Sequence, residues 1–373
     1  MSSSENNSKG SHRKLDLKAE NYPACAVEAL TRLETLIASR NKQNLVMQII
    51  SEYIFLERNK DGDGRKSQSL PISQMTLCQE FQLIIALIEY FSRPGRDATR
   101  NAIFLSLFGS HLTPQRCKLL SRLISTAISG SLAPLLSAAG TWMQQVGCKT
   151  PHSLEVAQNL VSDFILYSRK TPEQFKQLPM VGPHFAANLM VAVAELYLNE
   201  QRSAALTPPP DALLDAITEW MNENPTLCQA SQQPLILPAG AIAMPFATPL
   251  AGLLRWAVLA PMVSSRLAYS NLHLSVLRTL QQTVTSGEST PLPLQDLMQV
   301  IKSLQNYCAR LSETSVDPRT DAAYQKCMER LAQAVQIALS CNCITNQIQL
   351  LCVLESLPNQ KLMDIIIAAN KKL

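Results

Sequence analysis

The spacing of apolar residues limits the possible folds of this chain more than any other feature. From Tyr22 almost to the C-terminus, apolar side chains recur at intervals of three and four residues, which places them on one side of an α-helix. Residues 119–127, 294–308 and 331–339 show the pattern most clearly. No comparable run alternates with period two, and the short apolar piece at 235–237 is bracketed by prolines. The sequence therefore predicts an all-α fold.

Glycine is scarce, and this narrows the function classes. The chain has 12 glycines in 373 residues, about 3%, which is under half the usual share of about 7%. Phosphate-binding loops and tight hairpins use glycine for positive φ angles or close backbone approach. The P-loop, dinucleotide-binding and serine-hydrolase motifs are also absent. Nucleotide-binding and all-β folds are therefore disfavoured.

Thr-Pro pairs mark the expected helix starts. A threonine can accept a free amide of the first turn, and proline at the first helical position loses only a donor that has no partner. Thr171 is also followed by the glutamine of a capping box at Gln174. The pairs begin at Thr113, Thr150, Thr171, Thr207, Thr248 and Thr290. Most intervals have the length of a helical hairpin, which predicts an irregular HEAT/armadillo-like solenoid, with a compact helical bundle as the alternative.

The composition changes along the chain predict its organisation. Residues 1–20 are rich in Ser, Asn and Lys and are expected to form a disordered N-terminal arm. Residues 21–200 are expected to hold the N-terminal helical repeats, and residues 211–373 the C-terminal repeats, continuous with the first half. Linkers are expected at 57–73, 201–210, 281–291 and 312–320. The prolines at 208–210 predict an extended stretch before Asp211 caps the next helix.

Cysteine use and charge indicate where the protein works. The ten cysteines are scattered and no signal peptide precedes them, so we expect reduced thiols in the cytosol or nucleus. The net charge of +4 is mild and the basic residues are diluted along the chain, which does not indicate a nucleic-acid surface.

The sequence has no clear chemical site. No two of the five histidines lie within thirty residues of each other, and no HExxH or CxxC spacing occurs. Cys341, Cys343 and Cys352 come closest to a metal cluster, but a tetrahedral site needs a fourth ligand. We therefore expect no enzyme, no catalytic, metal or cofactor-binding residue and no cofactor. A cysteine and a histidine brought together by folding stay open as a third hypothesis.

One segment is unusual in having almost no charge. Residues 234–263 carry a single charge, Arg255, and five prolines, which predicts a buried segment of a soluble protein rather than a membrane span. The helix around Trp256 is apolar on all sides, and such helices are normally enclosed by their neighbours. Arg255, Trp256 and, on the following helix, His273 are the candidate protein-interface residues. Core positions are the alternative for Trp256 and His273.

The same region resembles a known family. The matching pieces are Thr248–Trp256 (TPLAGLLRW), Tyr269–Leu277 (YSNLHLSVL) and Arg330–Ala338 (RLAQAVQIA), with weaker matches from Phe81 to about Ile367. In order and spacing these pieces resemble Integrator complex subunit 15. Members of that family carry a lysine-rich insertion between the first two helices and a proline-rich tail, whereas here residues 261–268 connect the helices directly and the sequence ends at Leu373.

The resemblance implies an all-helical, non-catalytic scaffold subunit of the Integrator complex. It implies that the chain joins the module of subunits 10, 13 and 14 to the rest of the assembly and supports RNA polymerase II transcript processing, including small nuclear RNA. It implies protein partners rather than direct nucleic acid, no membrane, and a nuclear location, with the cytoplasm as a second compartment. A helical nucleic-acid-binding protein is the alternative function.

Overall fold

The computed structural model describes residues 21–37, 42–58, 72–95, 97–109, 112–200, 206–286, 292–344, 346–358 and 360–371. Within these ranges the regular structure is helical, apart from one pair of two-residue strands. The contacts divide the chain into two units, Met1–Tyr90 and Phe91–Leu373, which are described separately. The all-α prediction is confirmed.

The first unit is small. It contains α1 (Ala24–Leu36), α2 (Gln43–Ile49) with its π-helical continuation η2 (Ile50–Ile54), and most of α3 (Leu77–Ser92). Helix α1 packs against η2 and buries Leu30, Leu33 and Ile54 completely. The predicted linker at 57–73 begins and ends with β1 (Glu57–Arg58) and β2 (Ile72–Ser73), which pair antiparallel. The Asp-Gly repeat at residues 61–64, in the middle of this linker, lies outside the described residues.

The second unit begins with stacked helical pairs. Its elements are α4 (Asp97–Phe108), α5 (Pro114–Ser129), α6 (Ala133–Val146), α7 (Pro151–Val161) with the π-helical turn η3 (Ser162–Leu166), the short α8 (Glu173–Lys176) and α9 (Leu178–Val181), and α10 (Pro183–Leu196). Helix α4 packs against α6 and α5 against α7, so each helix contacts the next but one, as in stacked hairpins.

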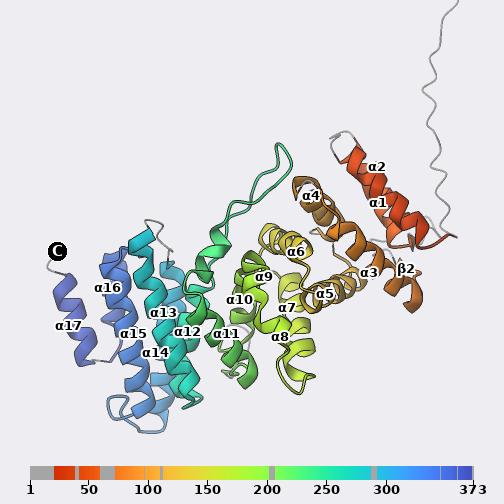
Figure 1. The fold of residues 1–373 in the computed structure, drawn as a ribbon. Coiled ribbons are helices and arrows are strands. Elements are labelled where there is room, and N and C mark those ends of the chain that lie inside the picture. The colour runs from red at the N-terminus through yellow and green to blue at the C-terminus, as the bar shows by residue number, and fades with distance from the viewer. Residues whose placement is uncertain are drawn as a thin grey trace, which may run out of the picture. The chain divides into compact units, whose positions relative to one another are not determined.

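The same pattern continues in the second half of this unit. There follow α11 (Asp211–Glu223), the 3₁₀ turn η4 (Leu227–Gln232), α12 (Leu250–Leu259), the 3₁₀ turn η5 (Ala260–Met262), α13 (Leu267–Ser286), α14 (Leu294–Glu313), α15 (Ala322–Ser340), α16 (Gln347–Leu354) and α17 (Lys361–Asn370). Helix α11 packs on α13, α13 on α15, α15 on α17 and α14 on α16. Figure 1 shows these helices side by side in green to blue. The solenoid prediction is confirmed.

Helix α12 lies at the centre of this half and contacts α10, α13, α14 and α15. All its residues except Gly252 are buried, as expected for a helix that is apolar on all sides. Gly252 allows the close approach to α10, because a Cβ built there would lie 2.5 Å from the Cβ of Ala194. Figure 1 places α12 between α10 and α14.

The Thr-Pro signals located helices better than they predicted capping bonds. The Thr113 hydroxyl accepts from the Arg116 amide at 3.3 Å, as predicted. Thr150 precedes α7, but its hydroxyl donates to the Gly147 carbonyl at 2.8 Å. The capping box predicted at Thr171 is wrong, because α8 starts after Pro172 and has no side-chain cap. Thr290 lies outside the described residues.

Two further boundaries differ from those predicted. Thr207 does not begin a helix; α11 starts at Asp211 with Pro210 as its N-terminal flanking residue. The linker expected at 281–291 is too long, because α13 continues to Ser286, and α14 likewise runs to Glu313. The last turns of these helices are polar, so the spacing of apolar residues does not show where the helices end.

The predicted division between residues 200 and 211 stays a prediction, although α10 contacts η4 and α12 across that linker. The predicted arm at 1–20 lies outside the described residues. Among the helices that the structure describes, none combines the length and apolar character needed to cross a lipid bilayer.

Candidate interaction surfaces

An irregular arm, residues 233–249, lies between η4 and α12 in the second unit and carries several exposed apolar side chains. Figure 1 shows it as a green loop that leaves the helices near α11 and runs towards α6 and α4. It contains no charged residue. Four of its large side chains, Ile236, Ile242, Met244 and Phe246, are exposed, from 41% at Phe246 to 86% at Ile242, while Leu235 and Leu237 are half-buried. The prediction of a buried segment over 234–263 is therefore wrong for the arm and right for α12.

Side-chain amides of two helices hold the arm in place. Asn101 on α4 donates to the Ile236 carbonyl at 2.9 Å, and Gln144 on α6 donates to the Met244 carbonyl at 3.1 Å. Gln145 on α6 bonds the arm twice: it donates to the Ile242 carbonyl at 3.2 Å and accepts from the Met244 amide at 2.8 Å. The backbone of the arm is thus fixed while its apolar side chains face solvent.

The tip of the arm is a tight turn. The Ala241 amide donates to the Pro238 carbonyl at 3.0 Å, and Gly240 has a φ of +80°, where a side chain would be strained. Pro238 and Gly240 thus reverse the chain so that both halves of the arm reach α4 and α6.

A buried polar network continues from the arm into the core. His184 Nε2 on α10 lies 2.9 Å from Gln144 Oε1 and 3.1 Å from Asn188 Nδ2. Asn188 in turn donates to the Gly140 carbonyl at 3.0 Å. Burial lowers the pKa of His184 to about 4, because desolvation disfavours the charged imidazole. His184 is therefore neutral at physiological pH and helps to orient the glutamine that holds the arm.

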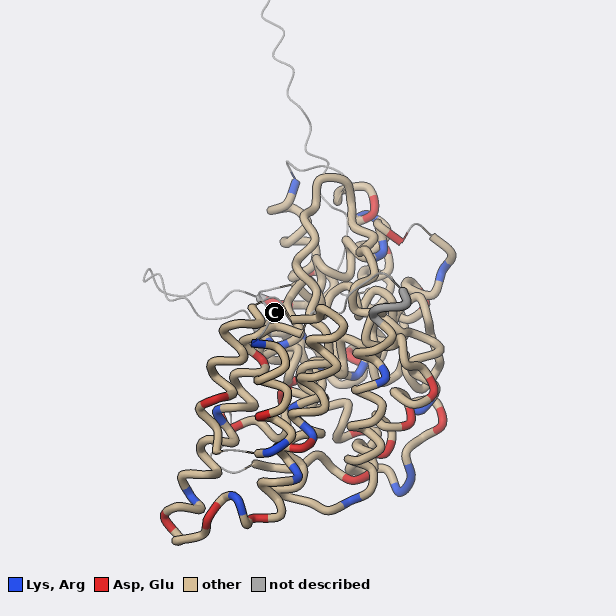
Figure 2. Tube along the Cα trace, turned by 90° about the vertical axis from the view of Figure 1, so that its left-hand side faces the viewer, with Lys and Arg blue, Asp and Glu red and all other residues tan. Residues whose placement is uncertain are grey.

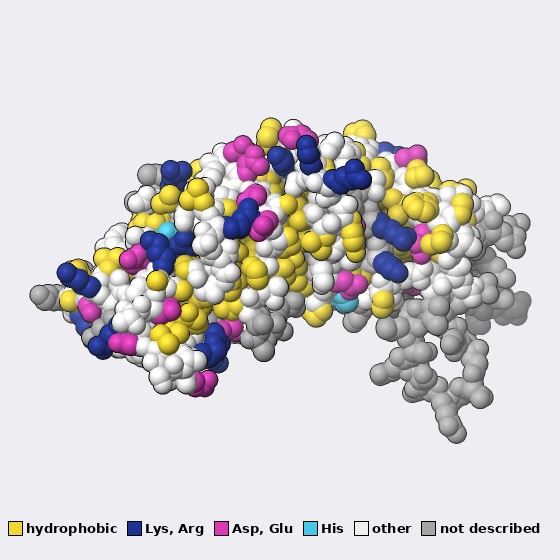
Figure 3. All heavy atoms as spheres, turned by 90° about the horizontal axis from the view of Figure 1, so that it is seen from below, with side chains coloured by type: hydrophobic (Ala, Val, Ile, Leu, Met, Phe, Trp, Pro, Cys, Tyr) yellow, Lys and Arg dark blue, Asp and Glu magenta, His cyan; other side chains and the backbone are white. Residues whose placement is uncertain are grey.

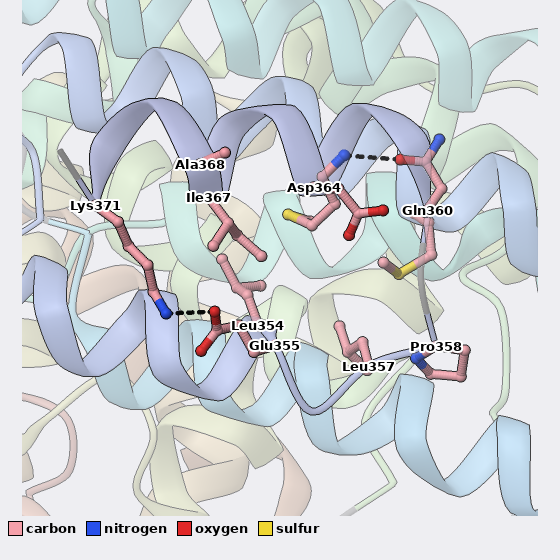
Figure 4. Close-up of a pocket in the computed structure, with 11 residues that line it drawn as sticks. Leu354, Glu355, Leu357, Pro358, Gln360, Asp364, Ile367, Ala368 and Lys371 are labelled. Carbon is pink, nitrogen blue, oxygen red and sulfur yellow. Dashed lines mark hydrogen bonds and ion pairs between the residues drawn. The ribbon is translucent and has the colours of Figure 1, made fainter.

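A second surface feature lies at the C-terminal end of the chain, where α15, α16 and α17 enclose a groove of about 470 Å³. Figure 4 shows Leu354, Leu357 and Ile367 lining its apolar part. An ion pair between Lys371 and Glu355 lies at one end, and Gln360 accepts from the Met363 amide at the other. Mostly aliphatic side chains line the groove, and it brings together no set of groups that could act on a substrate.

Arg255 and Trp256 lie inside the second unit. Arg255 is 4% exposed; its Nη2 donates to the Ala194 carbonyl at 2.6 Å and its Nη1 lies 3.7 Å from Glu195 Oε1. Trp256 is fully buried, and its indole donates to the carbonyls of Ala194 at 3.2 Å and Tyr197 at 3.1 Å. Trp256 lies in the core of this unit, and the interface roles of Arg255 and Trp256 stay predictions. Both side chains join α12 to the end of α10.

His273 is also buried, 4% exposed, and its Nε2 lies 3.0 Å from Gln333 Oε1 on α15. Its pKa is lowered, first by desolvation. Sequence reasoning missed the equivalent role of Arg330, whose Nη1 donates to the Ala257 carbonyl at 2.6 Å and Nη2 to the Ser270 hydroxyl at 2.8 Å. Glu329 directly precedes Arg330, so the sequence gives no signal like the isolated charge at Arg255 that could have found it.

The fold brings one cysteine and one histidine together. Ligand atoms of Cys117 on α5 and of His152 and Glu155 on α7 all lie within 4.8 Å of one another. Burial, followed by the charge and hydrogen bond of Glu155, raises the pKa of Cys117 to about 12. The thiol is therefore protonated at neutral pH and is not an activated nucleophile. Cys341, Cys343 and Cys352 form no such group with a histidine among the described residues.

Charged side chains are mixed over the described surface. Figure 2 shows Lys and Arg alternating with Asp and Glu along the chain, and Figure 3 shows both signs interleaved on one face with apolar side chains between them. Several opposite charges form exposed pairs, such as Arg266 with Asp215 at 3.1 Å and Lys326 with Glu329 at 3.0 Å. On the face that Figure 3 shows, the Lys and Arg side chains of the described residues form no continuous stripe of the kind that binds nucleic acid.

Comparison with known proteins agrees with the resemblance in the sequence. Residues 11–359 match the family Integrator complex subunit 15. The chain is 82% identical to Integrator complex subunit 15 of Drosophila melanogaster over the full length of both proteins. It is 29% identical to that of Danio rerio and 27% identical to that of Homo sapiens, over 86% of this chain and 71% and 77% of those proteins. The chain belongs to the Integrator complex subunit 15 family.

Proposed function

We propose that this chain is a non-catalytic scaffold subunit that joins the module of Integrator subunits 10, 13 and 14 to the rest of the complex. It works in the nucleus and supports the processing of RNA polymerase II transcripts, including small nuclear RNA. Family membership already makes other Integrator subunits its partners. The proposal adds which subunits they are and that the chain acts by binding alone.

The observation that carries this proposal is the uncharged arm at 233–249. Exposed apolar side chains cost free energy in water unless a partner covers them, and such patches commonly mark protein-binding sites. Ile242, Met244 and Phe246 are exposed together on a backbone that hydrogen bonds hold in one conformation. A pre-ordered segment loses little conformational entropy on binding, which favours docking.

The predicted interface residues fit this proposal indirectly. The arm ends at Pro249, where α12 begins, and Arg255 and Trp256 fix α12 against α10. These two side chains therefore fix the base of the arm, and a partner contact of their own stays a prediction. The docking role of His273 stays a prediction.

The experiment compares two surface substitutions in the tagged full-length chain. Ile242→Asp places a charge on the arm, and Ile348→Asp places the same charge on α16 at nearly equal exposure, 86% against 81%. Co-purification from nuclear extract is measured for both, with helical content by circular dichroism as the folding check. We expect Ile242→Asp to reduce recovery of subunits 10, 13 and 14 by at least about tenfold, and Ile348→Asp to leave it unchanged.

Equal recovery with both variants would contradict a docking role for the arm. If the unmodified chain recovers no Integrator subunit, the scaffold proposal itself fails. The nucleic-acid alternative instead predicts RNA or DNA binding by the purified chain that weakens steeply with salt.

A further inference from the structure

Cys117, His152 and Glu155 form a group of side chains that the scaffold role does not explain. Cys117 is fully buried in the first turns of α5, and His152 and Glu155 lie three residues apart near the start of α7. Because residues at this spacing share one face of a helix, both α7 side chains can approach Cys117 on the helix packed against them. The fold thus brings three different metal-binding donors to one place.

We propose that these three residues bind one Zn²⁺ ion between α5 and α7. Sulfur, imidazole nitrogen and carboxylate oxygen are the three donor types that zinc takes in proteins. Around a tetrahedral Zn²⁺ such donors lie about 3.4–3.6 Å apart, as follows from metal–ligand distances of about 2.0–2.3 Å. The three donor atoms already lie within 4.8 Å of one another, so small side-chain rotations complete the site. The fourth position is open to water.

The two α7 side chains have the freedom that this closure requires. Glu155 is exposed and His152 is half-buried, whereas Cys117 is held inside the core. The fixed sulfur therefore defines the position of the ion, and the other two ligands move to it. This arrangement differs from a histidine already bonded in the core, such as His184 with Gln144.

The charges also favour a divalent cation. Cys117 enters the site as a thiol beside the Glu155 carboxylate and brings one proton with it. Zn²⁺ replaces that proton, which leaves to the solvent, and a sulfur–zinc bond forms in place of the sulfur–hydrogen bond. Thiolate and carboxylate together carry two negative charges, which the ion neutralises, so no net charge remains at the edge of the core.

The proposed ion has a structural role that is independent of the proposed function. It would connect α5 to α7, two helices that pack directly against each other. A ligand that binds only the folded chain stabilises it, so zinc should raise the Tm. The sequence does not indicate this group, because Cys117 and His152 lie far apart along the chain.

The test measures zinc bound to the full-length chain. The protein is purified, dialysed against a zinc-binding competitor, loaded with Zn²⁺, and its metal content is determined by mass spectrometry. Ser replaces the exposed Cys78 and Cys352 in every sample, because exposed thiols also bind zinc. We expect about one Zn²⁺ per chain, a Tm that rises by a few degrees with the metal, and a thiolate charge-transfer band when Co²⁺ replaces zinc.

Three variants and one control assign the site. Cys117→Ala, His152→Gln and Glu155→Gln should each weaken zinc binding by at least about tenfold. Glu155 is exposed, so its variant keeps the fold even if the buried cysteine variant does not. Cys228→Ala is the matched control, because Cys228 is equally buried and its pKa is likewise raised to about 12.

Loss of zinc in the three site variants with retention in the control supports the proposal. The absence of zinc from the protein that keeps Cys117, His152 and Glu155 would overturn it, as would binding that Glu155→Gln and His152→Gln leave unchanged. Equal loss in Cys228→Ala would also overturn it, because the metal would then not depend on this site. None of these outcomes depends on whether Integrator subunits co-purify.

Discussion

Substitutions at Arg255 test how α12 is held in the second unit. Its two main partners each keep another bond when the guanidinium is removed. The Ala194 carbonyl still accepts from Trp256 at 3.2 Å, and Glu195 still pairs with Lys149 at 3.1 Å and accepts from Asn199 at 2.9 Å. Arg255→Met therefore leaves both of these groups bonded and fills most of the same volume; only Gln299 Oε1, which accepts from Arg255 Nη1 at 3.3 Å, loses this bond. We expect it to lower the free energy of unfolding by only about 1–2 kcal/mol.

Arg255→Glu should cost far more. Burial lowers the pKa of Arg255, while Glu195 and Asp296 raise it, so the position lies in a field of negative charge. A glutamate there is buried, faces two like charges and cannot donate from an ionised carboxylate to the Ala194 carbonyl. An unpaired buried charge costs about 3–5 kcal/mol. We expect Arg255→Glu to weaken co-purification of Integrator subunits through this loss of packing.

Urea denaturation followed by far-UV circular dichroism measures both variants against the unmodified chain. The expected result is a small shift of the midpoint for Arg255→Met and a shift at least twice as large for Arg255→Glu. Equal shifts would contradict this reasoning, because both variants lose the guanidinium and only Arg255→Glu adds a buried negative charge. A folded Arg255→Glu protein that co-purifies normally would refute the expected effect on assembly.

Three further predictions concern pH, packing and capping. Burial lowers the pKa of His184 to about 4 in the folded chain, whereas the unfolded chain keeps the ordinary pKa of about 6.5 and so binds this proton first as the pH falls. The free energy of unfolding should therefore fall by about 3 kcal/mol between a pH of about 6.5 and a pH of about 4. Denaturation of His184→Gln at the same pH values should lack this contribution. Gly252→Val should lower the Tm by several degrees in calorimetry, because its Cβ would clash with Ala194, and an unchanged Tm would contradict the close approach. Thr113→Ala should cost about 1 kcal/mol in urea denaturation and Thr171→Ala much less, since only Thr113 caps its helix; equal costs would contradict this difference.

Much of the fold follows from apolar spacing. The stripe over 119–127 is buried in α5, and the stripe over 331–339 is buried in α15. In α14 the same rule works less well, because Met298 and Cys308 are only half-buried although they continue the stripe. The buried residues of α14 lie between Leu294 and Leu304, so the helix packs against its neighbours mainly over its first half. The spacing of apolar residues within one helix cannot show where a neighbouring helix ends.

The candidate surfaces were harder to predict. Low charge at 233–249 indicates burial for a helix but not for an irregular arm, and the four prolines within 233–249 keep the arm from being a helix. The bonds that hold it come from Asn101, Gln144 and Gln145, about a hundred residues or more away in sequence. Local patterns contain no information about such partners. The same limit hid the approach of Cys117 to His152.

Affinity purification of the tagged chain from nuclear extract tests the central claim most directly. Mass spectrometry of the eluate, after nuclease treatment and a wash at raised salt, should find Integrator subunits 10, 13 and 14 in amounts comparable to the tagged chain. An eluate without Integrator subunits, or one whose partners disappear when nucleic acid is digested, would contradict a scaffold that works through protein contacts.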